Sequence, residues 1–241
     1  MPKYEEIANI LRERILDGTY PVDSFLPHQT NLAEEFKVSR MTIKKAVNIL
    51  TVEGLIYSKQ GMGTKILNSS FWDKNDSLFR FNNYNGLSSD LKDDKRTLSS
   101  QVILFTVEFP NETIASRLAV DTQTPIYHII RLRLLDEQPF VLEHTYMPCD
   151  LVPGLTQEVL LQSIYTYIHE TLHIQFAGSY RHITADKPDD FDQKYLNCAL
   201  TDPILQVEQV VYLENGRPIE YSRSRNRYDS RGYSLLDVKN I

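Results

Sequence analysis

The stretch VSRMTIKKAVNIL, residues 38–50, has the periodicity of an amphipathic helix. Its apolar residues recur at i, i+3, i+4 and i+7, which gathers one face from Ile43, Ala46, Val47 and Leu50. Ser39 is expected to cap the helix, and Gly54 to end it. The opposite face carries Met41, Lys44, Lys45 and Asn48, with Arg40 at its edge. Such a cationic, amide-bearing face suits the major groove of DNA, and the alternative is an ordinary solvated surface.

The segments around this helix complete a small domain. Tyr4 to Ile15 has helical spacing and is followed by the stop Asp17-Gly18, and a second helix is expected after Pro27. Residues 55–58 and 64–67 are strand-like and flank a glycine-rich tip at 59–63. Three helices followed by a hairpin predict a winged helix-turn-helix domain over residues 1–68.

The charge distribution supports a nucleic-acid partner for this domain only. The whole chain has a net charge of −6, but residues 1–68 contain nine Lys and Arg against eight Asp and Glu. From Lys37 to Lys65 there are six basic residues and one acidic residue, Glu53. A local basic patch on an acidic chain is an electrostatic signature of DNA binding that the overall charge conceals.

These residues resemble the DNA-binding domain of the GntR family. The resemblance is carried by Leu26-Pro27, Leu32-Ala33, residues 38–42, Glu53-Gly54-Leu55-Ile56 and Gly61-Met62-Gly63-Thr64. It implies binding to double-stranded, palindromic operator DNA. Together with the helix face, it implies DNA contacts by His28, Gln29, Thr30, Ser39, Arg40, Thr42, Lys44, Lys45, Asn48, Lys59, Gln60 and Gly63.

Residues 69–85 are expected to be a linker, and residues 86–241 a second domain in which strands and helices alternate. The second domain contains a possible internal repeat. Four residues of its first half recur as the same residue type 78 or 79 positions later: Pro110 as Pro188, Leu118 as Leu196, Pro125 as Pro203 and Pro139 as Pro218. Chance alignment of prolines is the alternative. Direct hairpins imply antiparallel neighbours, so the fold class predicted is α+β, with a cleft where the two halves meet.

Two arginines are expected to line that cleft. Arg131 and Arg133 alternate in an otherwise apolar strand and therefore share one face, which favours an anion such as phosphate or carboxylate. Glu143 and Glu220 lie in other strands and could neutralise the arginines or accept hydrogen bonds from sugar hydroxyls. A purely structural Arg–Glu cross-strand ladder is the alternative.

Residues 85–235 resemble the UTRA effector domain of the HutC branch of the GntR family, which shares the chorismate-lyase fold. The resemblance rests on residues 86–89, Arg131-Leu132-Arg133, Ser163-Ile164-Tyr165 and Glu220-Tyr221-Ser222. It implies a homodimer and a small-molecule effector, most simply a phosphorylated sugar. The implied phosphate contacts are Ser88, Ser89, Arg131, Arg133, Ser163 and Tyr165, and the implied polyol contacts are Glu143, Glu220 and Tyr228.

The remaining sequence features narrow the function. Cys149 and Cys198 are far apart and lack metal-ligand spacing, and no long apolar run or secretory leader is present, so we expect a cytoplasmic protein without a membrane span. No nucleophile, metal or phosphate-loop motif appears, and His169 with His173 is at most half a metal site. We therefore expect no catalytic residues, metal or cofactor, and a repressor of a carbohydrate operon. The alternatives are a chorismate-lyase-fold enzyme fused to a DNA-binding module and an effector-independent DNA binder.

Overall fold

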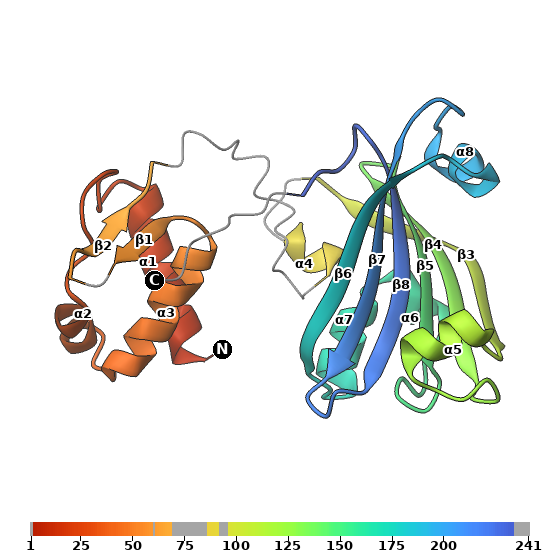
Figure 1. Cartoon of the computed structure of the whole chain (residues 1–241), viewed down its shortest axis with the longest axis horizontal. Coiled ribbons are helices and arrows are strands. Elements are labelled where there is room, and N and C mark those ends of the chain that lie inside the picture. Colours follow the sequence, from red (N-terminus) through yellow and green to blue (C-terminus); the bar gives the residue numbers. More distant parts are fainter. Residues whose placement is uncertain (1, 60, 69–85, 92–95, 234–241) are drawn as a thin grey trace. The chain divides into compact units, whose positions relative to one another are not determined.

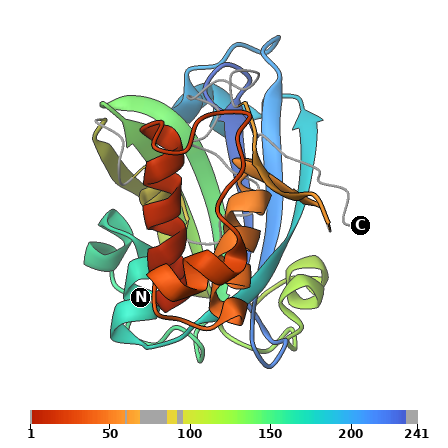
Figure 2. The same cartoon turned by 90° about the vertical axis from the view of Figure 1, so that its left-hand side faces the viewer.

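The computed structural model describes residues 2–59, 61–68, 86–91 and 96–233, which form two compact units. The first unit contains three helices and a hairpin (Figures 1 and 2): α1 (Lys3–Leu16), α2 (Gln29–Glu35), α3 (Arg40–Val52), β1 (Ile56–Lys59) and β2 (Gly63–Ile66). Strands β1 and β2 pair antiparallel and appear in Figure 2 as a narrow orange ribbon. The winged helix-turn-helix fold predicted for the first 68 residues is confirmed.

The core of the first unit is built from the apolar stripes of its helices. Helix α1 buries Ile7, Ala8, Leu11 and Ile15, and α3 buries Ile43, Ala46, Val47 and Leu50. Gly54 follows α3 with a φ of 72°, a left-handed conformation that glycine adopts without steric cost. The Leu55 amide then donates to the Leu50 carbonyl at 3.0 Å, which ends the helix and directs the chain into β1.

The second unit is a six-stranded antiparallel sheet with short helices. Its strands are β3 (Leu98–Glu108), β4 (Ile126–Leu135), β5 (Gln138–Pro148), β6 (Phe176–Asp186), β7 (Ile204–Leu213) and β8 (Pro218–Arg227), in the spatial order β3-β4-β5-β8-β7-β6. Its helices are α4 (Leu87–Asp90), α5 (Glu112–Leu118), α6 (Gln157–Leu161), α7 (Ile164–Thr166), the π-helical turn η3 (Tyr167–Thr171) and α8 (Asp190–Leu196). The predicted α+β class is confirmed, and residues 164–171 form a short α-helix that is continued by a π-helical turn.

The internal repeat is visible in the element order. Strand β6, helix α8 and strand β7 each begin 78 residues after β3, α5 and β4. The halves meet where β5 pairs with β8. Each helix packs across this seam, since α5 contacts β8 and α8 contacts β5. Successive side chains of each strand point to opposite faces of the sheet. Helices α5 and α8 pack on one face, and α4, α6, α7 and η3 pack on the other.

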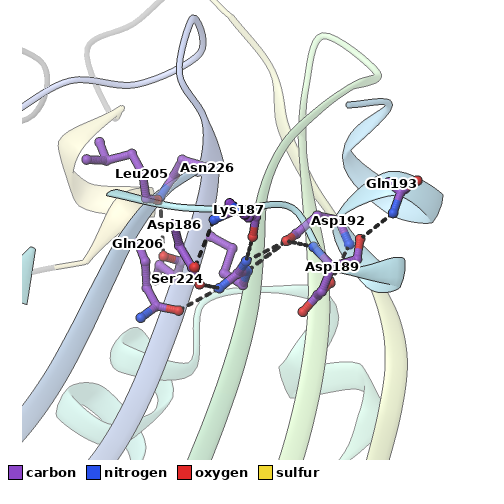
Figure 3. Close-up of polar contacts among 10 residues, drawn as sticks. Asp186, Lys187, Asp189, Asp192, Gln193, Leu205, Gln206, Ser224 and Asn226 are labelled. Atoms are coloured by element: carbon purple, nitrogen blue, oxygen red, sulfur yellow. Dashed lines mark hydrogen bonds and ion pairs between the residues drawn. The ribbon is translucent and has the colours of Figure 1, made fainter. Parts of the chain in front are cut away.

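Helix α8 is fixed to the sheet by a buried ion pair between Asp192 and Arg225 of β8 (Figure 3). The Arg225 Nε and Nη2 atoms both donate to the Asp192 carboxylate, at 2.7–3.0 Å. The Nη1 atom of Arg225 also donates to Asp186 at 2.9 Å and to Gln206 at 2.6 Å. At the corresponding place in the first half, α5 packs through Ile114 against Tyr146.

Candidate functional site

The exposed face of α3 is the first candidate site. The Ser39 hydroxyl accepts a hydrogen bond from the Thr42 amide at 3.2 Å, so the residues after it begin the helix in a fixed direction. The five side chains expected on this face are all exposed: Arg40, Met41, Lys44, Lys45 and Asn48. The apolar residues on the opposite side of α3 are buried in the core, so the exposed face is accessible to a partner.

Acidic side chains near α3 are occupied elsewhere. Glu53 forms an ion pair with Arg12 at 2.5 Å, and Glu35 forms one with Arg14 at 2.6 Å. Among the described residues, neither Arg40 nor Lys44 has an acidic partner within 4.0 Å. The Lys45 ammonium lies 5.5 Å from the centre of the Tyr4 ring, which steers it beside α1. The positive charge of Arg40 and Lys44 is therefore available to an anionic ligand such as DNA phosphate.

The other predicted DNA contacts lie at the start of α2 and on the wing. His28 occupies the N-cap position of α2 without a side-chain capping hydrogen bond and is exposed, as is Thr30, whereas Gln29 is half-buried. On the wing, Lys59 pairs with Gly63, whose φ is 86°. A Cβ at Gly63 would lie 3.3 Å from the Phe25 ring, so a larger residue would be crowded there as well as strained. Gln60 and the side chain of Lys59 lie outside the described residues.

A cavity on one face of the six-stranded sheet is the second candidate site. It brings together seven of the nine predicted effector contacts: Ser88, Arg131, Arg133, Glu143, Ser163, Tyr165 and Glu220. The sequence interpretation missed Gly86, Leu87, Thr145, Ile164, Arg181, Val207, Gln209, Ser222, Ser224, Arg231 and Tyr233. Tyr228 does not line the cavity, because β8 ends at Arg227 and the Tyr228 side chain is 58% exposed. The side chain of Ser89 lies outside the described residues.

One end of the cavity is cationic. Arg131 donates from Nη1 to the Leu160 and Gln162 carbonyls and from Nη2 to Glu143 at 2.7 Å. Arg133 donates from Nη2 to the Ser88 hydroxyl at 3.1 Å, and its Nη1 lies 3.6 Å from Glu143. Both arginines are about 95% buried, yet neither Nε atom has a hydrogen-bond partner among the described residues. A buried donor without a partner favours a ligand that accepts from it.

Glu143 lies between the two guanidinium groups. It stands directly opposite Arg131 in the β4–β5 register, so the cross-strand Arg–Glu pair considered from the sequence is present and also lines the cavity. Burial alone would raise the pKa of Glu143, but the charges of Arg131 and Arg133 outweigh burial and hold this pKa below its usual value. Burial is also the main reason that the pKa of Arg133 is lowered, with Arg131 adding to it. Two cations and one carboxylate leave this end with net positive charge.

The other end of the cavity has a different chemistry. Burial raises the pKa of Glu220, and the Ser222 hydroxyl donates to its carboxylate at 2.6 Å. The Gln209 amide donates to the Tyr165 hydroxyl at 3.1 Å and to Glu220 at 3.4 Å, and Arg181 donates to the Gln209 carbonyl at 2.5 Å. Burial, followed by the charge of Glu220, raises the pKa of Tyr165 well above its usual value. Amide, hydroxyl and carboxyl groups of this kind suit the hydroxyls of a polyol.

The first described residues of the second unit lie against this cavity. Gly86 has a φ of 77°, and a Cβ there would lie 2.9 Å from the Tyr165 ring. Two residues later, Ser88 accepts the hydrogen bond from Arg133. A ligand between Arg133 and Tyr165 would therefore meet the segment that leads from the first unit in sequence.

The described residues contain no group of three or more His, Cys, Asp or Glu side chains arranged to hold a metal ion. His169 lies with its Nδ1 atom 2.7 Å from the Ile174 carbonyl and its ring 4.5 Å from that of Phe176, so it is a packed side chain. No helix among the described residues combines the length and apolar character needed to span a membrane.

Comparison with known proteins gives the same two-part division. A profile described as "Bacterial regulatory proteins, gntR family" matches residues 3–66, and one for the UTRA domain matches residues 93–230. The chain is 46% identical over 239 residues to the HTH-type transcriptional regulator GmuR of Bacillus subtilis, covering 99% of this chain and 100% of that protein. It is 31% identical to the mannosyl-D-glycerate transport/metabolism system repressor MngR of Escherichia coli, over 98% of this chain and 95% of that protein. The crystal structure of the possible regulator YydK of Bacillus subtilis superposes with a TM-score of 0.80 at 26% identity, over 99% and 100% of the two chains.

Proposed function

The chain belongs to the HutC subfamily of the GntR family of bacterial regulatory proteins, and on this premise we propose that it represses a carbohydrate-utilisation operon and leaves its operator when a phosphorylated sugar binds the cavity. It is a transcriptional regulator and not an enzyme. The proposal adds the effector, the direction of the response, a homodimer and a cytoplasmic location. In domain terms, residues 1–68 bind DNA, residues 69–85 link the domains, and residues 86–241 bind the effector and dimerise.

The DNA-binding part of the proposal rests on the exposed face of α3. Its cationic side chains have no acidic neighbours among the described residues, and they begin at a capped helix N-terminus. In helix-turn-helix proteins, N-terminal residues of this helix reach base edges, and lysine and arginine contact phosphates. Arg40 and Lys44 are therefore assigned to the operator, with the wing and the start of α2 beside them.

The effector part rests on one observation above the others. Two buried arginines with unpartnered Nε atoms lie at one end of a cavity, while the other end is lined by Gln209, Ser222 and a Glu220 whose pKa is raised. A ligand that satisfies both ends needs an anionic group and hydroxyls, which is the chemistry of a sugar phosphate. The name of the relative MngR includes mannosyl-D-glycerate, a carbohydrate derivative that also carries an acid group.

The proposed mechanism of release from the operator rests on the residues that directly follow the linker, because they line the cavity. An effector changes operator affinity only if it binds one arrangement of the two domains more tightly than another. Gly86 and Ser88 line the cavity and directly follow the proposed linker in sequence. A ligand that binds Ser88 together with Arg133 would fix the start of the effector domain. It would thereby favour some relative arrangements of the two domains over others.

A homodimer matches a palindromic operator, since one recognition helix covers only half of such a site. The full-length protein should therefore show twice the 28.0 kDa mass of the chain in sedimentation at micromolar concentration. A monomer that binds a single half-site would contradict the dimer.

The effector is tested by thermal shift on the full-length protein with matched compounds: a hexose, its 6-phosphate, a disaccharide, its phosphate, and inorganic phosphate. A true effector should stabilise the protein by about 2.7 kcal/mol at a concentration of 100 Kd. The same compound should release a labelled operator duplex in an anisotropy titration, with a loss of affinity of about 5–150-fold. If no phosphorylated sugar gives a thermal shift or releases DNA, the effector-independent DNA binder becomes the better description.

A further inference from the structure

Met41 is an apolar side chain at the centre of a cationic surface. It lies in the first turn of α3 and is 62% exposed. At about 100° per residue, it points opposite to Leu50, which is fully buried in the core. Lys44 and Lys45 follow it at i+3 and i+4 and are exposed on the same face. Met41 is not part of the buried core, so the larger part of its side chain is available to a partner of this face.

The chemistry of methionine limits what that contact can be. Its thioether has no donor and is only a weak acceptor, so it cannot bind a phosphate as Lys44 and Arg40 can. It gains free energy only by leaving water against another apolar group, for which its flexible side chain is well adapted. In the major groove of DNA the apolar group on a base edge is the 5-methyl of thymine.

We propose that Met41 is a specificity-determining residue that recognises thymine through its 5-methyl group, at one position in each operator half-site. This inference rests on the proposed role of α3 as the helix that enters the major groove. Arg40 and Lys44 supply the attraction to the DNA backbone or to guanine. Met41 supplies discrimination against cytosine, which has only a hydrogen at C5 where thymine has the methyl group.

The test removes the methyl group alone. A duplex selected by the full-length protein from a random DNA library is resynthesised with each thymine replaced in turn by deoxyuridine. Anisotropy titrations then compare the wild-type protein with Met41→Ala. At one symmetric pair of positions, deoxyuridine should weaken wild-type binding about fourfold per half-site, the effect expected for one buried carbon. The same replacement should leave Met41→Ala binding unchanged, and Met41→Leu should keep most of the discrimination.

Two variants separate this inference from the function on which it rests. Arg40→Ala should weaken binding to the thymine and deoxyuridine duplexes by the same factor, because a cation does not read the methyl group. If Arg40→Ala and Lys44→Ala both bind as wild type, α3 is not the recognition helix and the proposed function is wrong at that point. If those variants lose affinity but Met41→Ala retains the full preference for thymine at every position, only the role of Met41 is refuted. Circular dichroism on each variant checks that the helices are intact.

Discussion

Replacing Arg225 by methionine should strongly destabilise the effector domain, because it leaves the Asp192 carboxylate buried without a partner. Asp192 is fully buried, and the Arg225 side chain is about 94% buried. Three of the hydrogen bonds of Arg225 go to this carboxylate, and others go to Asp186, Gln206 and the Lys187 carbonyl (Figure 3). Removing one partner of a buried ion pair costs about 3–5 kcal/mol. For a domain of this size that corresponds to a fall in Tm of roughly 6–20 °C.

The internal repeat supplies the matched control. The positions equivalent to Asp192 and Arg225 in the first half are Ile114 and Tyr146, which pack together in an apolar cluster. Exchange of a buried ion pair for well-packed apolar residues is often neutral or stabilising. The double variant Asp192→Ile, Arg225→Tyr should therefore recover most of the loss. A deficit of about 1 kcal/mol should remain, because Asp192 also accepts from the Asp189 amide in the capping box of α8.

The measurement is thermal and urea unfolding of the full-length chain at pH 7, on Arg225→Met and on a cycle formed by wild type, Asp192→Ile, Arg225→Tyr and the double variant. The reasoning predicts a coupling energy of at least about 2 kcal/mol between the two positions. A loss below about 1 kcal/mol in Arg225→Met would refute it. So would a double variant that is no more stable than the single ones, since the uncompensated charge would then not be the cause.

Three further predictions concern DNA, effector and pH. Arg40→Ala and Lys44→Ala should fold normally and bind the operator more weakly in anisotropy titrations. Loss of a base contact should cost about 1–3 kcal/mol of binding free energy, whereas loss of a phosphate contact should reduce the slope of log K against log salt concentration by about one. Arg133→Ala should bind operator as wild type but no longer release it with the sugar phosphate; a variant that still responds would make the Arg131–Arg133 pair structural. Burial lowers the pKa of His144 to about 4 from its usual 6.5, so this residue contributes stability above pH 6.5 that is lost as pH falls to 4, by up to about 3 kcal/mol. Unfolding of His144→Leu should show a flatter dependence over that range, and an unchanged slope would exclude His144 as the source.

The first domain could be predicted almost completely because its signals are local. Ser39, Gly54 and the apolar stripe of α3 each act within a few residues of their position, and the structure uses all of them as expected. The second domain depends on which strands pair. Alternation placed Arg131 and Arg133 on one face, but it could not tell that β8 pairs with β5, β7 with β8 and β6 with β7, so Gln209, Ser222 and Arg181 were missed. Tyr228 was expected in the cavity by resemblance, although the strand that would aim it there ends one residue earlier.

A signal for some of the missed residues was present in the repeat. Residues 78 positions after Arg131 and 79 positions after Glu143 are Gln209 and Ser222, and both line the cavity. The shift from 78 to 79 arises in the turn between the paired strands: two residues separate Leu135 from its partner Gln138, whereas three separate Leu213 from Arg217, whose carbonyl accepts from the Leu213 amide at 2.9 Å. The repeat therefore predicts which residues of the second half face the cavity once those of the first half are known. The repeat gives no such signal for Arg181: it pairs with Gln209, and the residue that pairs with the equivalent Arg131 is the apolar Val102.

The cavity has two chemically different ends because the halves that form it are related in backbone and different in side chains. The first half contributes Arg131 and Arg133, and the equivalent positions of the second half hold Gln209 and Val211. Likewise Glu143, which lies between the arginines, is answered by Ser222, which donates to Glu220. A pocket with four arginines across a two-fold axis would favour a symmetric dianion. Divergence of one half instead leaves Arg131 and Arg133 on the side of the cavity joined to the entering chain through Ser88, and Gln209 and Ser222 on the side of β7 and β8. The proposed function therefore predicts that an asymmetric ligand with one charged group binds in a single orientation.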